Sequence, residues 1–172
     1  HSAGVANTTG FYGSFFGWEA GRKNTTGLYN TFIGMRAGGE NIGGHENVAV
    51  GDRAGGGMSG STLSDYNTFV GAQAGQLSTA LQNTMIGGQA GWSSTTGNYN
   101  VFVGALTGDF NTTGSNNTVV GRNADVSVAT LNYATALGSD ALVNASNKVR
   151  LGNATITVVE GQVAYTFPSD GR

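Results

Sequence analysis

Few residues in this chain have the chemistry of a catalytic centre. It contains two histidines, His1 and His45, and no cysteine among its 172 residues. A nucleophilic site needs a serine, threonine or cysteine beside a base that a third group orients, and no Ser/His/Asp set can be assembled here. No pair of carboxylates recurs at a fixed position for general acid–base catalysis. We therefore expect no enzymatic activity and no cofactor.

One group of potential metal ligands surrounds His45. Glu40, Glu46 and Asp52 lie close enough in the sequence to approach it. Their spacing follows no metal-binding motif, and a histidine in Gly44-His45-Glu46 is explained as a solvated corner. We expect no metal. The many Gly-x-Gly arrangements are typical of turns, because a phosphate-binding loop needs a following helix N-terminus.

The overall composition excludes further classes of partner. The formal net charge is −2 and 10% of the residues are charged, which leaves no basic face for nucleic acid. No apolar run reaches membrane-spanning length, so we expect no membrane insertion of this segment. The absence of cysteine removes a disulfide framework but is compatible with an extracellular protein. The start at His1 indicates a piece of a longer chain.

A repeated stretch of nine residues organises the chain. Its clearest copies are residues 30–38, Asn-Thr-Phe-Ile-Gly-Met-Arg-Ala-Gly, and residues 67–75, Asn-Thr-Phe-Val-Gly-Ala-Gln-Ala-Gly. The glycine after the aliphatic residue, called the anchor glycine below, recurs most often every 17 residues. The anchor glycines are Gly17, Gly34, Gly51, Gly71, Gly87, Gly104, Gly121 and Gly138, with Gly152 as a further candidate. Such a period predicts a one-dimensional stack of coils with a glycine turn in each coil.

The residue types of the repeat favour strands over helices. Thr, Val, Ile and Phe cluster before each anchor glycine, and these residues favour strands. One coil accommodates two short strands and two turns, so that equivalent positions of successive coils stack at about 4.8 Å. We therefore predict an all-β fold, a parallel β-roll or β-helix solenoid with about 17 residues per coil.

A second turn of each coil precedes the strand. Glycines seven residues before the anchor, at Gly10, Gly27, Gly44, Gly97 and Gly114, are expected to be corners with positive φ. The Asn and Thr residues beside them are expected to bond their own backbone.

Tyrosines recur five residues before the anchor glycines. The five are Tyr12, Tyr29, Tyr66, Tyr99 and Tyr133. Stacked coils would turn them into a partial tyrosine ladder, which Glu46, Gln82 and Asn116 interrupt.

The strands are apolar on both faces. Because side chains alternate along a strand, one face points into the coil and the other must be covered by another molecule. We expect copies of the same chain to cover it, arranged with closed symmetry. The residues expected inside the coil are Phe16, Ile33, Val50, Val70, Ile86, Val103, Val120 and Leu137. The residues expected between three chains are Phe15, Phe32, Ala49, Phe69, Met85, Phe102, Val119 and Ala136. The reverse assignment remains open at this stage.

Two places depart from the period. The third coil is three residues longer, and its excess, between Gly55 and Asp65, is expected to protrude as a loop. After Gly138 the pattern weakens, which predicts β-roll repeats over residues 1–142 and a terminal β-connector over residues 143–172.

The anchor motif resembles the head repeats of trimeric autotransporter adhesins (YadA-like heads). The likeness covers residues 11–142 and rests on an aliphatic-Gly pair that is followed by Ala-Gly. It implies a left-handed parallel β-roll in which three chains pack side by side. Two departures stand out: the asparagine lies four residues before the glycine instead of five, and Phe often replaces a small residue.

The C-terminal residues carry a second resemblance. Lys148-Val149-Arg150-Leu151-Gly152-Asn153 and Ser169-Asp170-Gly171-Arg172 look like the segment before the intramolecular chaperone of endosialidase-type phage tail fibres. This likeness implies a self-cleaving chaperone domain beyond the present segment, with Ser169 at the release point and the catalytic basic residue after Arg172.

These patterns together predict a non-enzymatic, homotrimeric head or shaft segment of an extracellular adhesin or tail fibre. It would belong to a bacterial cell surface, a phage or a contractile injection particle, and would attach to a surface receptor, glycan or matrix component. The expected contact residues are Trp18, Met58, Trp92 and Phe110, which could stack on sugars or staple coils together. The alternative is a solenoid that binds ice or a polysaccharide lattice through stacked threonines such as Thr25 and Thr26.

Overall fold

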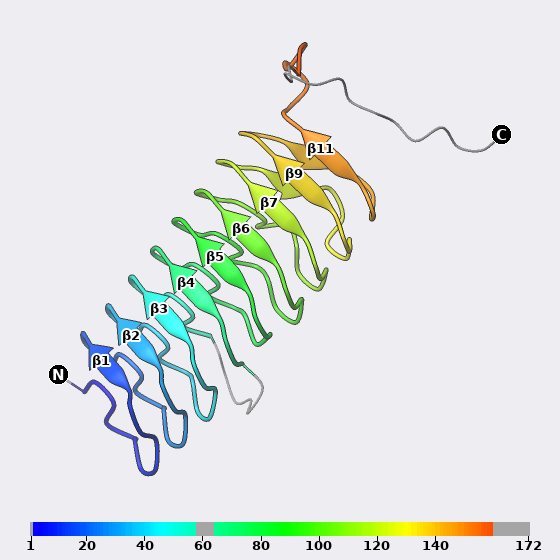
Figure 1. Cartoon of the computed structure of the whole chain (residues 1–172). Coiled ribbons are helices and arrows are strands. Elements are labelled where there is room, and N and C mark those ends of the chain that lie inside the picture. Colours follow the sequence, from blue (N-terminus) through cyan, green and yellow to red (C-terminus); the bar gives the residue numbers. More distant parts are fainter. Residues whose placement is uncertain (1, 58–63, 160–172) are drawn as a thin grey trace.

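The chain is a parallel β-solenoid with one short strand per coil on its main face. The computed structural model describes residues 2–57 and 64–159, and within these residues every regular element is a strand (Figure 1). The strands are β1 Ser14–Phe16, β2 Thr31–Ile33, β3 Val48–Val50, β4 Thr68–Val70, β5 Thr84–Ile86, β6 Val101–Val103, β7 Thr118–Val120, β8 Asp125–Val126, β9 Thr135–Leu137, β10 Leu142–Val143 and β11 Val149–Leu151. The all-β solenoid with about 17 residues per coil is therefore confirmed. The second strand expected in each coil occurs among the described residues only as β8 and β10.

Successive coils pair in strict register. Nine strands form one parallel sheet in the order β1-β2-β3-β4-β5-β6-β7-β9-β11, and equivalent residues of the repeat face each other, as Phe32 faces Ala49 and Ile33 faces Val50. β8 and β10 pair in a separate two-stranded sheet near the C-terminal end. Because each coil contacts its neighbours along the whole sheet, the solenoid is a rod of stacked, equivalent units.

The middle residue of each strand, not the third, points into the coil. Phe32, Phe69, Met85 and Phe102 are 0% exposed in the single chain, whereas the neighbouring Ile33 is 40% exposed. The prediction that the third residue of each strand points into the coil and the middle residue points outward is therefore wrong. The middle residues now found inside the solenoid are Phe15, which is partly buried, and Phe32, Ala49, Phe69, Met85, Phe102, Val119 and Ala136. The residues now found on the outside of the sheet are Phe16, Ile33, Val50, Val70, Ile86, Val103, Val120 and Leu137.

The Ala-Gly pair of the repeat explains this direction. Alanines three residues after the anchor, such as Ala37 and Ala74, are fully buried beside the large side chains. Gly38 follows with φ of 55°, and a Cβ there would lie 2.6 Å from the ring of Phe32. Only a glycine leaves room for the aromatic ring in the coil. Both strand faces are apolar, so alternation alone could not decide between them.

Buried asparagines hold successive coils together from within. Each is the first residue of the repeated stretch, and its Oδ1 accepts the backbone N–H of the equivalent residue one coil further. Asn47, Asn67 and Asn83 show the pattern: Asn67 N–H donates to Asn47 Oδ1 over 3.0 Å, and Asn83 N–H donates to Asn67 Oδ1 over 2.9 Å. The asparagine ladder consists of Asn30, Asn47, Asn67, Asn83, Asn100 and Asn117, all at most 1% exposed. These side chains satisfy buried backbone groups of the next coil, not only of their own turn.

The second corner differs from its expected form. Gly27 and Gly44 do not have positive φ, and the same holds for the equivalent Gly10, Gly97 and Gly114. Positive φ occurs instead two residues later, at the tyrosine position. A Cβ on Gly27 would collide with Asn24 Oδ1 and with the carbonyl oxygen of Gly44, so glycine is required there by the space that the buried asparagines occupy.

The main sheet continues past residue 143. β11 pairs with β9, with Val149 opposite Thr135, so the first part of the expected terminal connector still belongs to the solenoid. Residues 152–159 contain no strand. No helix among the described residues is long and apolar enough to span a membrane.

Candidate functional site

The outer surface of the main sheet is uncharged. We call the first and third residues of its nine strands the sheet face. The third residues are all aliphatic or aromatic, and the first residues are Ser, Thr or Val. With about 4.8 Å between neighbouring strands, the sheet face is about 38 Å long. A monomeric protein seldom exposes so long an apolar stripe, which makes this surface a candidate interface.

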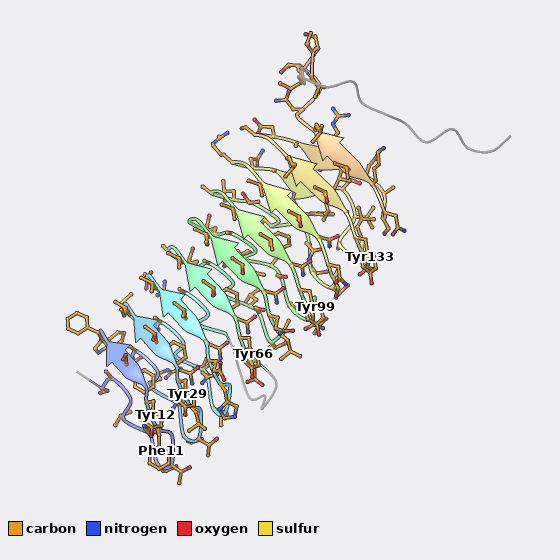
Figure 2. The ribbon with its side chains drawn as sticks, in the orientation of Figure 1. Phe11, Tyr12, Tyr29, Tyr66, Tyr99 and Tyr133 are labelled. Atoms are coloured by element: carbon orange, nitrogen blue, oxygen red, sulfur yellow. The ribbon has the colours of Figure 1, made fainter. Side chains whose placement is uncertain are left out.

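A row of exposed tyrosines runs along one edge of the solenoid (Figure 2). The members are Tyr12, Tyr29, Tyr66, Tyr99 and Tyr133, which are between 52% and 77% exposed. Tyr12 and Tyr29 belong to adjacent coils, and their rings are stacked with centroids 5.0 Å apart and planes 9° from parallel. We call this edge, with the residues that lie between the tyrosines, the tyrosine row.

From Tyr29 onward the row alternates strictly between tyrosine and a polar residue. The residues at the same corner of the intervening coils are Glu46, Gln82, Asn116 and Asn147, all exposed. They have the same left-handed backbone as the tyrosines, with φ between 53° and 60°. The sequence pattern predicted Glu46, Gln82 and Asn116 as interruptions of a ladder. In the structure they and Asn147 form the second half of a two-coil repeat.

The backbone of the tyrosine row is tied to the preceding coil at every step. The N–H of Tyr29 donates to Phe11 O over 3.1 Å, and the N–H of Tyr66 donates to His45 O over 3.0 Å. Tyr99 and Tyr133 donate in the same way, to Leu81 O and Ser115 O. The positions of the Cα atoms are therefore fixed by the solenoid, while the exposed rings can rotate about their side-chain bonds.

His45 stabilises the corner beneath the row. Its Nδ1 accepts the N–H of Leu28 over 3.0 Å, and its own N–H donates to Asp65 Oδ1 over 2.7 Å. The imidazole is thus used as a turn cap. Among the described residues no group of three or more His, Cys, Asp or Glu side chains could hold a metal ion.

A charged hollow lies at the opposite corner of the first coils. Arg22, Arg36 and Arg53 line a space of about 190 Å³ together with Glu40. Arg22 and Lys23 both pair with Glu40, and although burial acts to raise it, their hydrogen bonds hold the pKa of Glu40 below its ordinary value. Since these ion pairs are partly exposed, they add little stability. The hollow is thus lined by a network of ion pairs.

A second hollow lies beside the small sheet. Phe110, Asp125, Asp140 and Leu142 are among the residues that line its volume of about 410 Å³. Burial raises the pKa of Asp125 to about 6, although the N–H groups of Phe110 and Val126 donate to its carboxylate and oppose the shift. Both oxygens of Asp125 are therefore occupied by the backbone, which favours a role in closing the turn over one in catalysis.

The predicted contact aromatics do not form one cluster. Trp92 and Phe110 belong to adjacent coils, in which Ser93 Oγ donates to Asp109 Oδ1 over 3.1 Å, whereas Trp18 lies in the first coil. Trp18 is 45% exposed and lies under the Arg36 guanidinium, 4.7 Å from the ring centroid. Trp92 donates from Nε1 to Gln76 Oε1 over 3.1 Å, and Phe110 is 58% exposed at the second hollow. The structure does not bring these three together, and Met58 and Ser169 lie outside the described residues.

The threonines of the second corner have a structural role. Thr25 Oγ1 donates to Ile42 O over 3.1 Å, and Thr95 Oγ1 donates to Thr112 O over 2.9 Å. Thr8 and Thr79 make the equivalent bond to the next coil. These hydroxyls are engaged within the solenoid, whereas Thr26 is exposed.

Comparison with known proteins adds no family to this description. No protein-family model matches the chain, and neither a curated protein nor a solved structure matches it. The sheet face and the tyrosine row are the two extended surfaces that recur from coil to coil.

Proposed function

We propose that this chain is a non-enzymatic head or shaft segment of an extracellular homotrimeric fibre, and that its three copies pack through the sheet face. The single observation that carries the proposal is the exposed apolar sheet. Phe16 is 77% exposed, and Ile33, Ile86 and Leu137 are 36–40% exposed, all on one surface of the single chain.

The energetic reason for association is the burial of that surface. Each square ångström of apolar area removed from water contributes about 25 cal/mol. None of the outward strand residues is charged, so packing them against one another requires no desolvation of ionic groups. Three copies rather than two are inferred from the resemblance of the repeat to trimeric adhesin heads.

Such an assembly would work through geometry. Backbone ladders and the asparagine ladder make each coil stack rigid, and three parallel rods would present every surface feature three times. Repetition of a weak contact raises the overall affinity through effective concentration. The segment would then serve attachment to a receptor, glycan or matrix component, on a bacterial surface or on a phage or injection particle.

Cysteine cross-linking tests the location of the interface. The chain has no cysteine, so a single Val70→Cys substitution on the sheet face can be oxidised without side reactions. We expect a covalent dimer of Val70→Cys on a denaturing gel, because equivalent residues of three chains meet near the common axis. Asn116→Cys on the tyrosine row is the matched control and should remain monomeric. Equal cross-linking of the two variants would contradict the proposal.

A second candidate function uses the same surface. Thr31, Thr68, Thr84, Thr118 and Thr135 occupy first positions of the main strands, beside the aliphatic row of third positions. A row of threonines at the spacing between strands, although interrupted by Val48 and Val101, favours binding of an ice lattice. That function would need the sheet face to stay open, so a monomer with thermal hysteresis would support it over the fibre.

A further inference from the structure

We propose that the tyrosine row binds an extended β-1,4-linked polysaccharide, with pyranose rings stacked on every second coil. The inference supplies a ligand class for the attachment role proposed above and rests on that role for its biological setting. The binding itself requires only one edge of one chain, so it can be tested separately from the trimer.

The tyrosine row repeats every two coils. Tyr29, Tyr66, Tyr99 and Tyr133 lie two coils apart, which corresponds to about 9.6 Å between neighbours. An extended β-1,4-linked chain has a two-residue screw repeat of similar length, so alternate pyranoses meet equivalent positions. Four tyrosines in register would follow such a chain over about 29 Å.

The alternation of aromatic and polar residues along the row matches the chemistry of a sugar ring. A pyranose has an apolar face of C–H groups and a rim of hydroxyls. In the free chain the rings of Tyr12 and Tyr29 face each other, so binding requires the exposed ring of Tyr29 to turn outward about its side-chain bonds. Tyrosine rings turned in this way supply aromatic faces for the former, and the side chains between them supply hydrogen-bonding groups for the latter. Three of these polar residues, Gln82, Asn116 and Asn147, carry an amide that both donates and accepts hydrogen bonds. The hydroxyls of a sugar placed over one of them therefore find hydrogen-bond partners.

Glu46 gives the row one distinct position. Tyr29 and Glu46 line a shallow hollow of about 470 Å³. The next residue of the row is Tyr66. A carboxylate accepts hydrogen bonds from neighbouring hydroxyls, and such charge-assisted bonds are stronger than neutral ones. This end of the row is therefore expected to hold a sugar more tightly than the positions with amides.

Folding does not require tyrosine at this corner. Every residue of the row has φ of about 53–60°, a conformation that is unfavourable for bulky side chains and easier for Gly or Asn. Asn116 and Asn147 show that asparagine is accommodated. Five tyrosines in a strained conformation, with rings that stay in solvent, point to a function outside the fold.

Retention on insoluble polysaccharide tests the proposal with the whole chain. Microcrystalline cellulose and chitin are the two probes, and they distinguish glucose from N-acetylglucosamine as the repeating sugar. We expect the chain to co-sediment with at least one polymer and to be released by the matching soluble hexasaccharide. Absence of retention on both polymers would overturn the proposal.

The variant Tyr66→Asn/Tyr99→Asn removes two stacking positions and keeps side chains that this corner already holds elsewhere. Two lost aromatic contacts should weaken retention about tenfold, with the melting temperature unchanged. Leu106→Asn is the control, because it removes an exposed apolar side chain away from the row, at a corner with positive φ that holds Asn123 in the next coil. Equal losses in the two variants would overturn the assignment of binding to the tyrosine row.

A third variant tests the alternation. Gln82→Tyr/Asn116→Tyr fills the polar positions with rings, and we expect no gain in retention because hydrogen bonds to the sugar rim are lost. Stronger retention would mean unspecific aromatic adhesion and would overturn the two-coil register. All variants should keep the oligomeric mass of the wild-type protein in sedimentation equilibrium. A change in polysaccharide retention at unchanged oligomeric mass then concerns the tyrosine row and not the fibre proposal.

Discussion

The backbone N–H of Asn47 donates to Oδ1 of Asn30 over a distance of 2.9 Å, and the Asn47 side chain donates to the same oxygen over 3.2 Å. The first residue of one repeat is thus bonded to the first residue of the repeat before it. Since both side chains are buried, the bonds are shielded from water and their loss leaves unsatisfied groups. The recurrence of asparagine at this position is therefore explained by assembly of the coil stack.

Replacing one member of the asparagine ladder should destabilise the whole rod. In Asn67→Ala the N–H of Asn83 loses its acceptor, and the carbonyl of Ala80 loses the Nδ2 donor that lies 2.8 Å away. We expect the free energy of unfolding to fall by about 2–4 kcal/mol, measured by urea denaturation. Asn116→Gly, at an exposed corner with positive φ, is the control and should change stability little. Similar losses in both would disprove the role of the ladder.

Neighbouring glycines should differ sharply in their tolerance of alanine. Gly87 has φ of 134°, and a Cβ there would collide with the Gly104 carbonyl of the next coil. We expect Gly87→Ala to prevent folding or to lower the melting temperature severely. A Cβ on Gly88 has open space around it, and the equivalent residues Ala72 and Ala105 are alanines. Gly88→Ala should be neutral or slightly stabilising in thermal denaturation; two equally damaged proteins would contradict the stacking of anchor glycines.

The inward direction of the middle strand residue has a direct energetic test. Phe69 is 0% exposed, so Phe69→Ala leaves a cavity and should reduce the free energy of unfolding by about 3–5 kcal/mol. Tyr66→Asn, which removes an exposed aromatic ring from the same coil, should cost less than about 1 kcal/mol. Chemical denaturation measures the free energy of unfolding of the two variants. A larger loss of this free energy in Tyr66→Asn than in Phe69→Ala would contradict the inward direction of Phe69.

The raised pKa of Asp125 predicts a pH effect on stability. In the unfolded chain this carboxyl has the ordinary aspartate pKa of 3.8, whereas burial in the fold raises its pKa to about 6. Between these values the folded state binds more protons than the unfolded state, so stability falls as the pH rises from about 4 to about 6. We expect wild type to lose stability relative to Asp125→Asn across this range, in urea denaturation at several pH values. A constant difference between the two proteins would show that the group is not perturbed.

The sequence reveals the period, the strand positions and the main turns because these depend on local spacing. Anchor glycines at fixed intervals and a Thr-Phe-Ile run before Gly34 are enough to predict a parallel coil stack. The direction of Phe32 and Ile33 is not a local property. Both are apolar, and the choice depends on the depth of the coil, which Ala37 and Gly38 make wide enough for an aromatic ring.

The tyrosine row shows a similar limit. Tyr29 and Tyr66 can be recognised in the sequence as parts of a tyrosine ladder. If the repeat is taken to be one coil long, Glu46 between them is an interruption of that ladder. The shared positive φ of all three residues shows that the row is a single structural feature. A search for a period of two coils would have found the alternation of tyrosine and polar residues in the sequence itself.

The mass of the chain in solution tests the central claim most directly. One copy has a mass of 17.5 kDa, and sedimentation equilibrium at micromolar concentration should give three times that value, about 52.5 kDa. Val70→Glu/Ile86→Glu, which places carboxylates on the sheet face, should sediment as a monomer, while Tyr66→Asn should remain a trimer. A wild-type protein that sediments at 17.5 kDa would contradict the homotrimeric fibre.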